Sequence, residues 1–148
     1  MNVEAVIQQA RGLCAQWTKD AQTPEPNRLD LSLAEADLVP AVSALRTARW
    51  GYLSAITGLD RGGGELEALY HFCSGAAVLT LRVRIQRAEP SIPTLCGVLP
   101  AASFFERELS EMFGVTIVGA QNPEHLFLPD DWSAGEFPLR KDFRTASG

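Results

Sequence analysis

The chain has 148 residues, of which 46% are hydrophobic and 21% are charged, and its formal net charge is −5. This is the composition of a folded domain with a core of its own, which excludes a wholly disordered chain. The basic residues form no run, so nucleic acid is not expected as a partner.

The sequence lacks the patterns of metal-binding, secreted and membrane-spanning chains. No stretch approaches the roughly 20 apolar residues that cross a bilayer, and the N-terminal segment carries charge too early for a signal peptide. The cysteines Cys14, Cys73 and Cys96 are odd in number and far apart, and the histidines His71 and His125 have no paired spacing. We therefore expect a reduced, cytoplasmic chain that holds no cofactor and no metal and has no membrane span.

Hydrophobic periodicity and proline placement predict the elements of the first half. From Val3 to Trp17 apolar residues recur every three or four positions, as on one face of a helix, and the prolines within 20–27 end it. Asp37 is the better N-cap for the next helix, because it leaves Pro40 in the first turn. The expected order is a helix over 3–17, a break over 20–27, a strand over 28–33, a helix from 38 to about 49, a strand over 50–60 and a flexible loop over 61–64.

Two alternating segments, 65–73 and 76–87, predict a β-hairpin with Ser74 and Gly75 as its two-residue loop. In that register the cross-strand neighbours are Cys73 and Ala76, Tyr70 and Leu79, Ala68 and Leu81, Leu66 and Val83, Glu67 and Arg82, and Glu65 and Arg84. The apolar pairs share one face and the opposite charges share the other, which we expect to be solvated.

A further helix is expected over 100–113, opened by Pro100 and closed by Gly114. Its charged residues could be a catalytic cluster, a solvated face or an interface with another protein. No nucleophile, metal ligand or phosphate-binding loop accompanies them, so an interface is favoured, a solvated face comes second and catalysis last. These charged residues are Glu106, Arg107, Glu108 and Glu111.

Helical spacing assigns the four charges to different sides of that helix. Its apolar stripe consists of Phe105, Leu109 and Met112. Arg107 and Glu111 lie opposite the stripe, four residues apart, where they can pair. Glu108 lies against the stripe and Glu106 flanks its other edge, and a carboxylate in such a place can have a raised pKa.

A short strand is expected over 115–118, and no periodicity remains from Gly119 onward. The tail is rich in aromatic residues but interrupted by prolines, so it cannot form a core of its own and should settle only on a partner's surface. Its aromatic residues are Phe127, Trp132, Phe137 and Phe143. The whole chain therefore predicts an α+β domain over 1–118, with helices covering a mostly antiparallel sheet, and an extended partner-binding arm over 119–148.

Three motifs, "ERELSEMFGV", "LFLPDDW" and "FPLRKDF", resemble the family of the thirty-kilodalton subunit, or C subunit, of NADH–quinone oxidoreductase (respiratory complex I). They also resemble the homologous subunit of membrane-bound energy-converting nickel–iron hydrogenases and of formate hydrogenlyase. The resemblance spans residues 103–143.

The resemblance implies an accessory subunit without a redox centre, held at the cytoplasmic side of the membrane by its partners. The partners would be a large subunit of the 49-kDa or hydrogenase-large type and neighbouring iron–sulfur subunits. These subunits, and not this chain, would carry iron–sulfur clusters, flavin, quinone or nickel–iron. Asp142, with Arg140 and Lys141, would anchor the arm. The residues expected at the partner interface are Glu106, Arg107, Glu108, Glu111, Met112, Phe113, Phe127, Asp131, Trp132, Pro138, Arg140, Lys141, Asp142 and Phe143.

Two alternatives accompany this interpretation. "SEMFG" and "LPDDW" look more like the hydrogenase branch, and Gly119, Ala120 and Gln121 replace the Gly-His-Pro of many respiratory members. A hydrogenase or formate hydrogenlyase component is therefore the first alternative. A free-standing assembly or interaction protein is the second.

Overall fold

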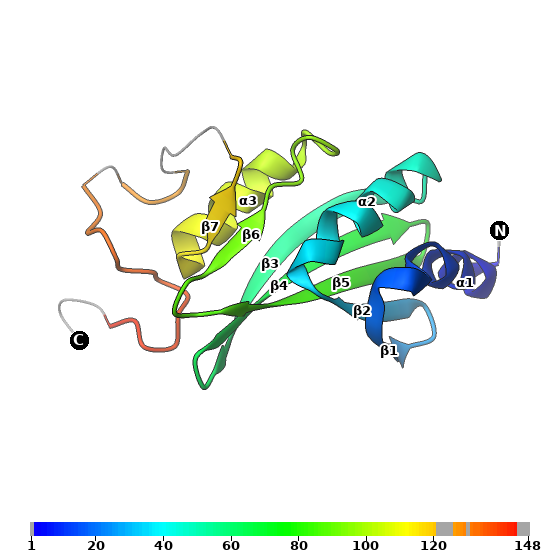
Figure 1. The fold of residues 1–148 in the computed structure, drawn as a ribbon, viewed down its shortest axis with the longest axis horizontal. Helices are drawn as coiled ribbons and strands as arrows, with labels where there is room; N and C mark the ends of the chain where they lie inside the picture. The colour runs from blue at the N-terminus through cyan, green and yellow to red at the C-terminus, as the bar shows by residue number, and fades with distance from the viewer. Residues whose placement is uncertain (1, 121–125, 130, 145–148) are drawn as a thin grey trace.

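Helices and strands alternate irregularly along the chain in the computed structural model shown in Figure 1, which describes residues 2–120, 126–129 and 131–144. The features expected at Gln121 and His125 lie outside these residues. The elements are α1 (Val3–Cys14), β1 (Thr18–Glu25), β2 (Arg28–Leu33), α2 (Leu38–Thr47), β3 (Tyr52–Gly62), β4 (Glu65–Ser74), β5 (Ala77–Gln86), β6 (Ser91–Pro93), α3 (Ala102–Phe113) and β7 (Thr116–Val118), with short 3₁₀ turns at Ala15–Trp17 and Glu35–Asp37.

A five-stranded sheet in the order β1-β2-β5-β4-β3 forms the centre of the fold, and β6 and β7 make a separate parallel pair. Within the larger sheet only β2 and β5 run parallel. The buried apolar side chains alternate along β4, as on a sheet with one face covered by helices. The contacts of α1 with β5 and of α3 with β3 supply that cover. The predicted α+β class with a mostly antiparallel sheet is confirmed.

The prediction of a break over 20–27 is wrong in part, because this segment forms most of an edge strand. β1 pairs antiparallel with β2, and its register is irregular between Gln22 and Glu25. Pro24 lies in that irregular stretch, and an edge strand tolerates a proline because one side of its backbone needs no sheet partner. The strand is exposed along almost all of its length, so no apolar alternation marked it in the sequence.

The first helix is held to the second by a buried tryptophan. Burial of Val6, Ile7 and Ala10 gives α1 its inward face, as the period predicted. Trp50, just beyond α2, donates its indole N–H to the Val6 carbonyl oxygen at 2.9 Å. Asp37 occupies the N-cap position of α2, as predicted, but its side chain makes no capping hydrogen bond.

The β4–β5 hairpin has the predicted faces but a different register, so the predicted pairing is wrong by two residues. Leu66 lies opposite Ile85, and Glu67 opposite Arg84. The turn consists of Gly75 and Ala76, with Ser74 paired to Ala77. Gly75 has a φ of +57°, and glycine is favoured there because a type II′ turn needs a positive φ at its first central position. A shift of two residues keeps every side chain on its face, so the predicted core side of the hairpin is confirmed.

The charged face of the hairpin is not simply solvated, which corrects the expectation. Glu67 is 3% exposed and accepts hydrogen bonds from Arg82 and Arg61. Arg82 also reaches Asp30 of β2 at 3.2 Å, and these bonds hold the Arg82 pKa above its ordinary value, the hydrogen bond to Glu67 contributing most. The network ties β2, β3, β4 and β5 together on the face opposite the helices.

Helix α3 approaches β3 closely at Gly58. A Cβ atom at this position would lie 2.4 Å from the Phe113 ring and 3.0 Å from a Leu109 methyl carbon. Both side chains are buried, so the space that the missing Cβ leaves is filled by the helix. Gly58 therefore fixes how closely α3, and everything attached to it, lies on the sheet.

Gly58→Ala is expected to destabilise the fold by about 1–3 kcal/mol, as overpacking of a core does. Gly12→Ala is the matched control, since nothing lies within 4 Å of a Cβ at Gly12 in α1. The free energy of unfolding of the control should rise by about 0.5–1 kcal/mol, because alanine is the better helix residue. Urea denaturation of both variants measures the change in the free energy of unfolding. A stabilised or unchanged Gly58→Ala variant would contradict the close packing of α3 on β3.

Glu67→Ala is expected to lower the free energy of unfolding by about 1.5–3 kcal/mol, because a buried carboxylate with two guanidinium partners is lost. Glu65→Ala removes a more exposed carboxylate that pairs with Arg84 at 3.1 Å. Its cost should be only about 0.2–1 kcal/mol. Thermal and urea unfolding of the two variants check this order, which would be refuted by equal losses.

Candidate functional site

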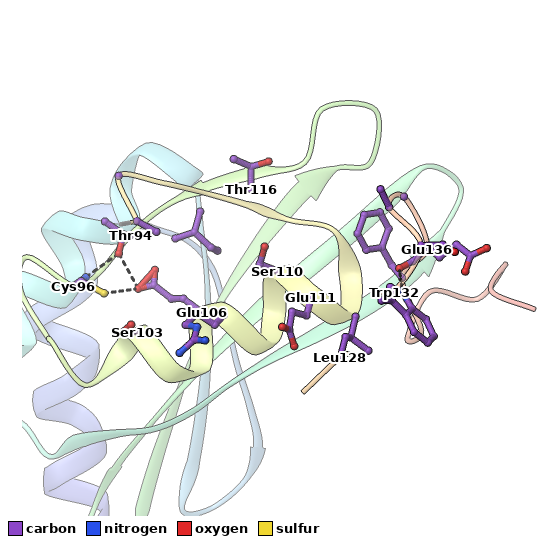
Figure 2. Close-up of a pocket in the computed structure, with 18 of the residues that line it drawn as sticks. Thr94, Cys96, Ser103, Glu106, Ser110, Glu111, Thr116, Leu128, Trp132 and Glu136 are labelled. Carbon is purple, nitrogen blue, oxygen red and sulfur yellow. Dashed lines mark hydrogen bonds between the residues drawn. The ribbon is translucent and has the colours of Figure 1, made fainter. Parts of the chain in front are cut away.

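A groove of about 1060 Å³ lies between α3, the β6–β7 pair and the C-terminal arm. Figure 2 shows Glu106 and Glu111 projecting from α3, with Trp132 and Glu136 of the arm beyond them. Arg107 also lines this groove, so the structure brings several of the predicted interface residues to one place.

Glu106 is the most enclosed carboxylate of the groove, with 2% of its surface exposed. Its Oε1 accepts hydrogen bonds from the Thr94 hydroxyl at 2.9 Å and from the Leu95 N–H at 3.2 Å. The Cys96 thiol donates to the same oxygen at 3.3 Å (Figure 2). These contacts tie the loop after β6 to α3. Burial raises the Glu106 pKa above its ordinary value, and the three donors oppose that rise.

Cys96 takes part in this network as a thiol donor, and its pKa lies above the ordinary value. Burial is the main cause of its raised pKa, and the hydrogen bond to Glu106 also raises it. A protonated thiol is a poor nucleophile and a poor metal ligand. Across the described residues, no group of three or more histidine, cysteine, aspartate or glutamate side chains could hold a metal ion.

Glu111, placed by helical spacing opposite the apolar stripe, is buried against the arm. Its carboxylate accepts hydrogen bonds from the backbone N–H groups of Leu126 and Phe127, the latter at 2.8 Å. The arm folds back over this side of α3, which helical spacing alone could not reveal. Glu108, predicted to lie against the apolar stripe, is half-buried.

The last turn of α3 is capped by the arm. The Leu139 N–H donates to the Met112 carbonyl oxygen at 3.0 Å, and Arg140 Nε donates to the Phe113 carbonyl oxygen at 2.7 Å. Carbonyl groups at a helix C-terminus have no partner within the helix, so these bonds satisfy groups that otherwise need water. Phe137 packs on Gly114, the residue that ends α3.

The arm is also attached to the end of β3. The Lys141 N–H donates to Asp60 Oδ2 at 2.8 Å, and Asp142 forms an ion pair with Arg87. Asp60 was not identified from the sequence. The predicted anchoring residues Arg140, Lys141 and Asp142 thus all contact this chain's own domain. The expectation that the arm settles only on a partner is not met by its described residues.

The remaining predicted interface residues lie along the arm. Trp132 stacks on Phe143 with ring centroids 6.0 Å apart and donates its indole N–H to the Glu136 carbonyl oxygen. Asp131 is exposed and Pro138 is half-buried. Trp132 and Phe143 therefore both have contacts within this chain.

Three large apolar side chains in the described parts of α3 and the arm remain open to solvent: Phe104, Phe127 and Leu139, which we call the α3–arm patch. Phe104 lies in the first turn of α3, and Leu139 lies beside its last turn, where its N–H reaches Met112. The three side chains are 50%, 52% and 56% exposed. Phe104 and Phe127 meet edge to face with centroids 5.8 Å apart. Phe104 and Leu139 were missed in the sequence, where an apolar residue beside a charged helix face gives no sign of its exposure.

Glu106→Gln is expected to remove one component of the pH dependence of stability. A carboxyl group with a raised folded pKa stabilises the fold as the pH falls towards its unfolded value of about 4.3. The amide oxygen can still accept the three hydrogen bonds, but glutamine cannot be protonated. The wild type should therefore gain stability relative to the variant as the pH falls from 7 to 4.

Urea denaturation across that pH range measures the difference. Glu25→Gln, at an exposed carboxylate of β1, is the control and should follow the wild type. Parallel curves for wild type and Glu106→Gln would show that burial of Glu106 does not disfavour its charge.

Comparison with known proteins identifies relatives of the whole fold. The family model described as respiratory-chain NADH dehydrogenase, 30 Kd subunit, matches residues 31–147. NAD(P)H-quinone oxidoreductase subunit J of Synechococcus sp. (strain WH7803) is 32% identical over 153 residues, covering 90% of this chain and 83% of that protein. NAD(P)H-quinone oxidoreductase subunit J of Prochlorococcus marinus (strain AS9601) is 33% identical over 124 residues, covering 77% and 69%.

A solved structure supports the fold. A chain from the membrane-bound sulfane sulfur reductase, an archaeal respiratory membrane complex, superposes with a TM-score of 0.80 at 24% identity, covering 97% of this chain and 86% of that one. In the part of the chain that the structure describes, no helix is long and apolar enough to cross a membrane. The family match over most of the sequence confirms the predicted resemblance, and the chain belongs to the 30-kDa subunit family of respiratory-chain NADH dehydrogenase.

Proposed function

We propose that this chain is a non-catalytic subunit of a membrane-associated oxidoreductase complex, in which α3 and the arm dock on a larger subunit. Family membership supports the place in such a complex. Both sequence relatives described above are named as subunits of quinone oxidoreductases. Their names favour a quinone reductase over a hydrogenase or a free-standing assembly protein.

The docking face is inferred from the exposure of the α3–arm patch. Aromatic residues are enriched in protein interfaces because they bury a large area with few rotatable bonds. Phe104 and Phe127 come from segments far apart in the sequence, yet their rings are in contact and half open. An edge-to-face pair kept exposed on a well-packed domain is suited to insertion into a partner's pocket.

The predicted interface residues divide into two roles on this face. Glu106, Glu111 and Phe113 are buried within the chain and would shape the face from behind. The others would contact the partner or form the polar rim around the patch: Arg107, Glu108, Met112, Phe127, Asp131, Trp132, Pro138, Arg140, Lys141, Asp142 and Phe143.

The partner in this proposal is the large subunit of the 49-kDa type, with neighbouring iron–sulfur subunits beside it. Those subunits would hold the iron–sulfur clusters, flavin and quinone, while this chain holds none. Contact with them would keep the chain at the cytoplasmic face of the membrane without a span of its own.

Replacing the two rings by charge tests the docking face. A tagged chain with Phe104→Asp and Phe127→Asp, produced in the native host, should recover at least roughly tenfold less large subunit than the wild-type chain, as loss of an interface hot spot does. Leu59→Asp is the matched control, because Leu59 is 41% exposed but lies on the sheet in β3. Mass spectrometry identifies the large subunit by its sequence.

Two results would overturn the proposal. Recovery of the large subunit by the double variant at the wild-type level would exclude the α3–arm patch as the docking face. Absence of the wild-type chain from the mature membrane complex, with recovery only during assembly, would favour the assembly protein. Melting temperatures of the isolated variants show whether their domains remain folded.

A further inference from the structure

Asp60 is a buried carboxylate near the end of β3, at an irregularity in its pairing with β4. It is 5% exposed, and the pairing with β4 becomes irregular directly after it, between Asp60 and Gly62. Irregularities of this kind redirect a side chain out of the regular pleat. The Gly62 N–H donates to Asp60 Oδ1 at 2.9 Å, which fixes the carboxylate in place.

The second oxygen of this carboxylate is occupied by the arm. Asp60 Oδ2 accepts the Lys141 N–H at 2.8 Å, across 81 positions of sequence. Hydrogen bonds from two backbone N–H groups hold the Asp60 pKa below its ordinary value, the bond from Lys141 contributing most. The carboxylate is therefore ionised at neutral pH, and both bonds are charge-assisted.

This attachment differs from the others that hold the end of the arm. The Leu139 and Arg140 bonds go to carbonyl groups of α3, so they move with that helix. The Asp142–Arg87 ion pair is exposed, and exposed pairs contribute little to stability. Asp60 supplies a part-buried bond to the sheet itself, which gives the arm a fixed position relative to both α3 and β3.

We propose that Asp60 is a positioning residue for docking: by holding Lys141 on the end of β3 before assembly, it sets where Leu139 of the α3–arm patch meets the larger subunit. The proposal rests on the docking function given above. Leu139 is two residues from the anchored amide, and its side chain is 56% exposed. Leu139 is also held by the bond from its own N–H to Met112, so the Asp60 bond acts on it by fixing the arm that leads away from it two residues later.

Asp60→Asn tests this with the full chain. Asparagine has one acceptor oxygen and places an NH₂ group against the other backbone N–H, so one of the two bonds is lost. Asp20→Asn is the matched control, because Asp20 lies in β1, at the opposite edge of the sheet from β3. Hydrogen exchange of the Lys141 and Leu139 amides reports arm attachment, and recovery of the large subunit from the native host reports docking.

In Asp60→Asn we expect exchange at Lys141 and Leu139 to accelerate by roughly tenfold or more, while amides of β4 and β5 keep their protection. Recovery of the large subunit should fall, and Asp20→Asn should match the wild type in both measurements. Unchanged exchange at the Leu139 amide in both Asp60→Asn and the second variant described below would show that Asp60 does not hold the arm. Faster exchange with full recovery would show that the anchor does not position the docking face.

A second variant covers the case in which Asp60→Asn fails to fold. Lys141→Pro keeps Asp60 and the rest of the arm but removes the backbone N–H that Asp60 accepts, so it should show the same exposure of the Leu139 amide and the same loss of recovery. Wild-type recovery by this variant would overturn the role of Asp60. Failure of the wild-type chain to recover any large subunit would instead count against the docking function, while the exchange measurement would still decide whether Asp60 holds the arm.

Discussion

The close approach of α3 to β3 at Gly58 is the constraint on which the candidate site depends. Every feature of that site is attached to α3: Glu106 on its inner side, Phe104 on its outer side and the carbonyl groups of its last turn. The helix can lie this close only because residue 58 has no Cβ, which leaves room for Phe113 and Leu109. The packing contact at Gly58 therefore sets the height of α3 on the sheet, and hydrogen bonds from the arm then hold the rest of the site to that helix.

Buried carboxylates then connect this helix and the sheet to distant parts of the chain. Glu106 holds the loop after β6, Glu111 holds the start of the described arm and Asp60 holds its end. A buried ionised group is tolerated only when donors replace its water, and here backbone N–H groups are among those donors in each case. Backbone donors are available to any sequence that folds this way, so only the acceptor has to be supplied by a particular side chain.

This explains which parts of the structure could be predicted from the sequence. Periodicity is a local property, so α1, α2, α3 and the faces of β4 and β5 were predicted correctly. The hairpin register was missed because the predicted and observed registers differ by two residues and so put the same side chains on each face. The backbone conformation at Gly75 distinguishes the two registers. The burial of Glu111, the role of Asp60 and the exposure of Phe104 each depend on a segment distant in sequence. A helical wheel shows an element's own stripe and cannot show what the arm covers.

Attachment of the arm to its own domain reduces the entropy that docking on a partner would cost. Fixing a residue costs about 1–2 kcal/mol of conformational entropy, and an arm that folds only on its partner subtracts this cost from the affinity. Here the described arm residues already satisfy the α3 carbonyl groups and the Asp60 carboxylate, so much of that ordering is offset within the chain. Phe104, Phe127 and Leu139 remain at least half exposed, whereas Trp132, Phe137 and Phe143 are half-buried within the chain. Burial of the three exposed side chains on a larger subunit can then contribute to binding with little further ordering of the arm.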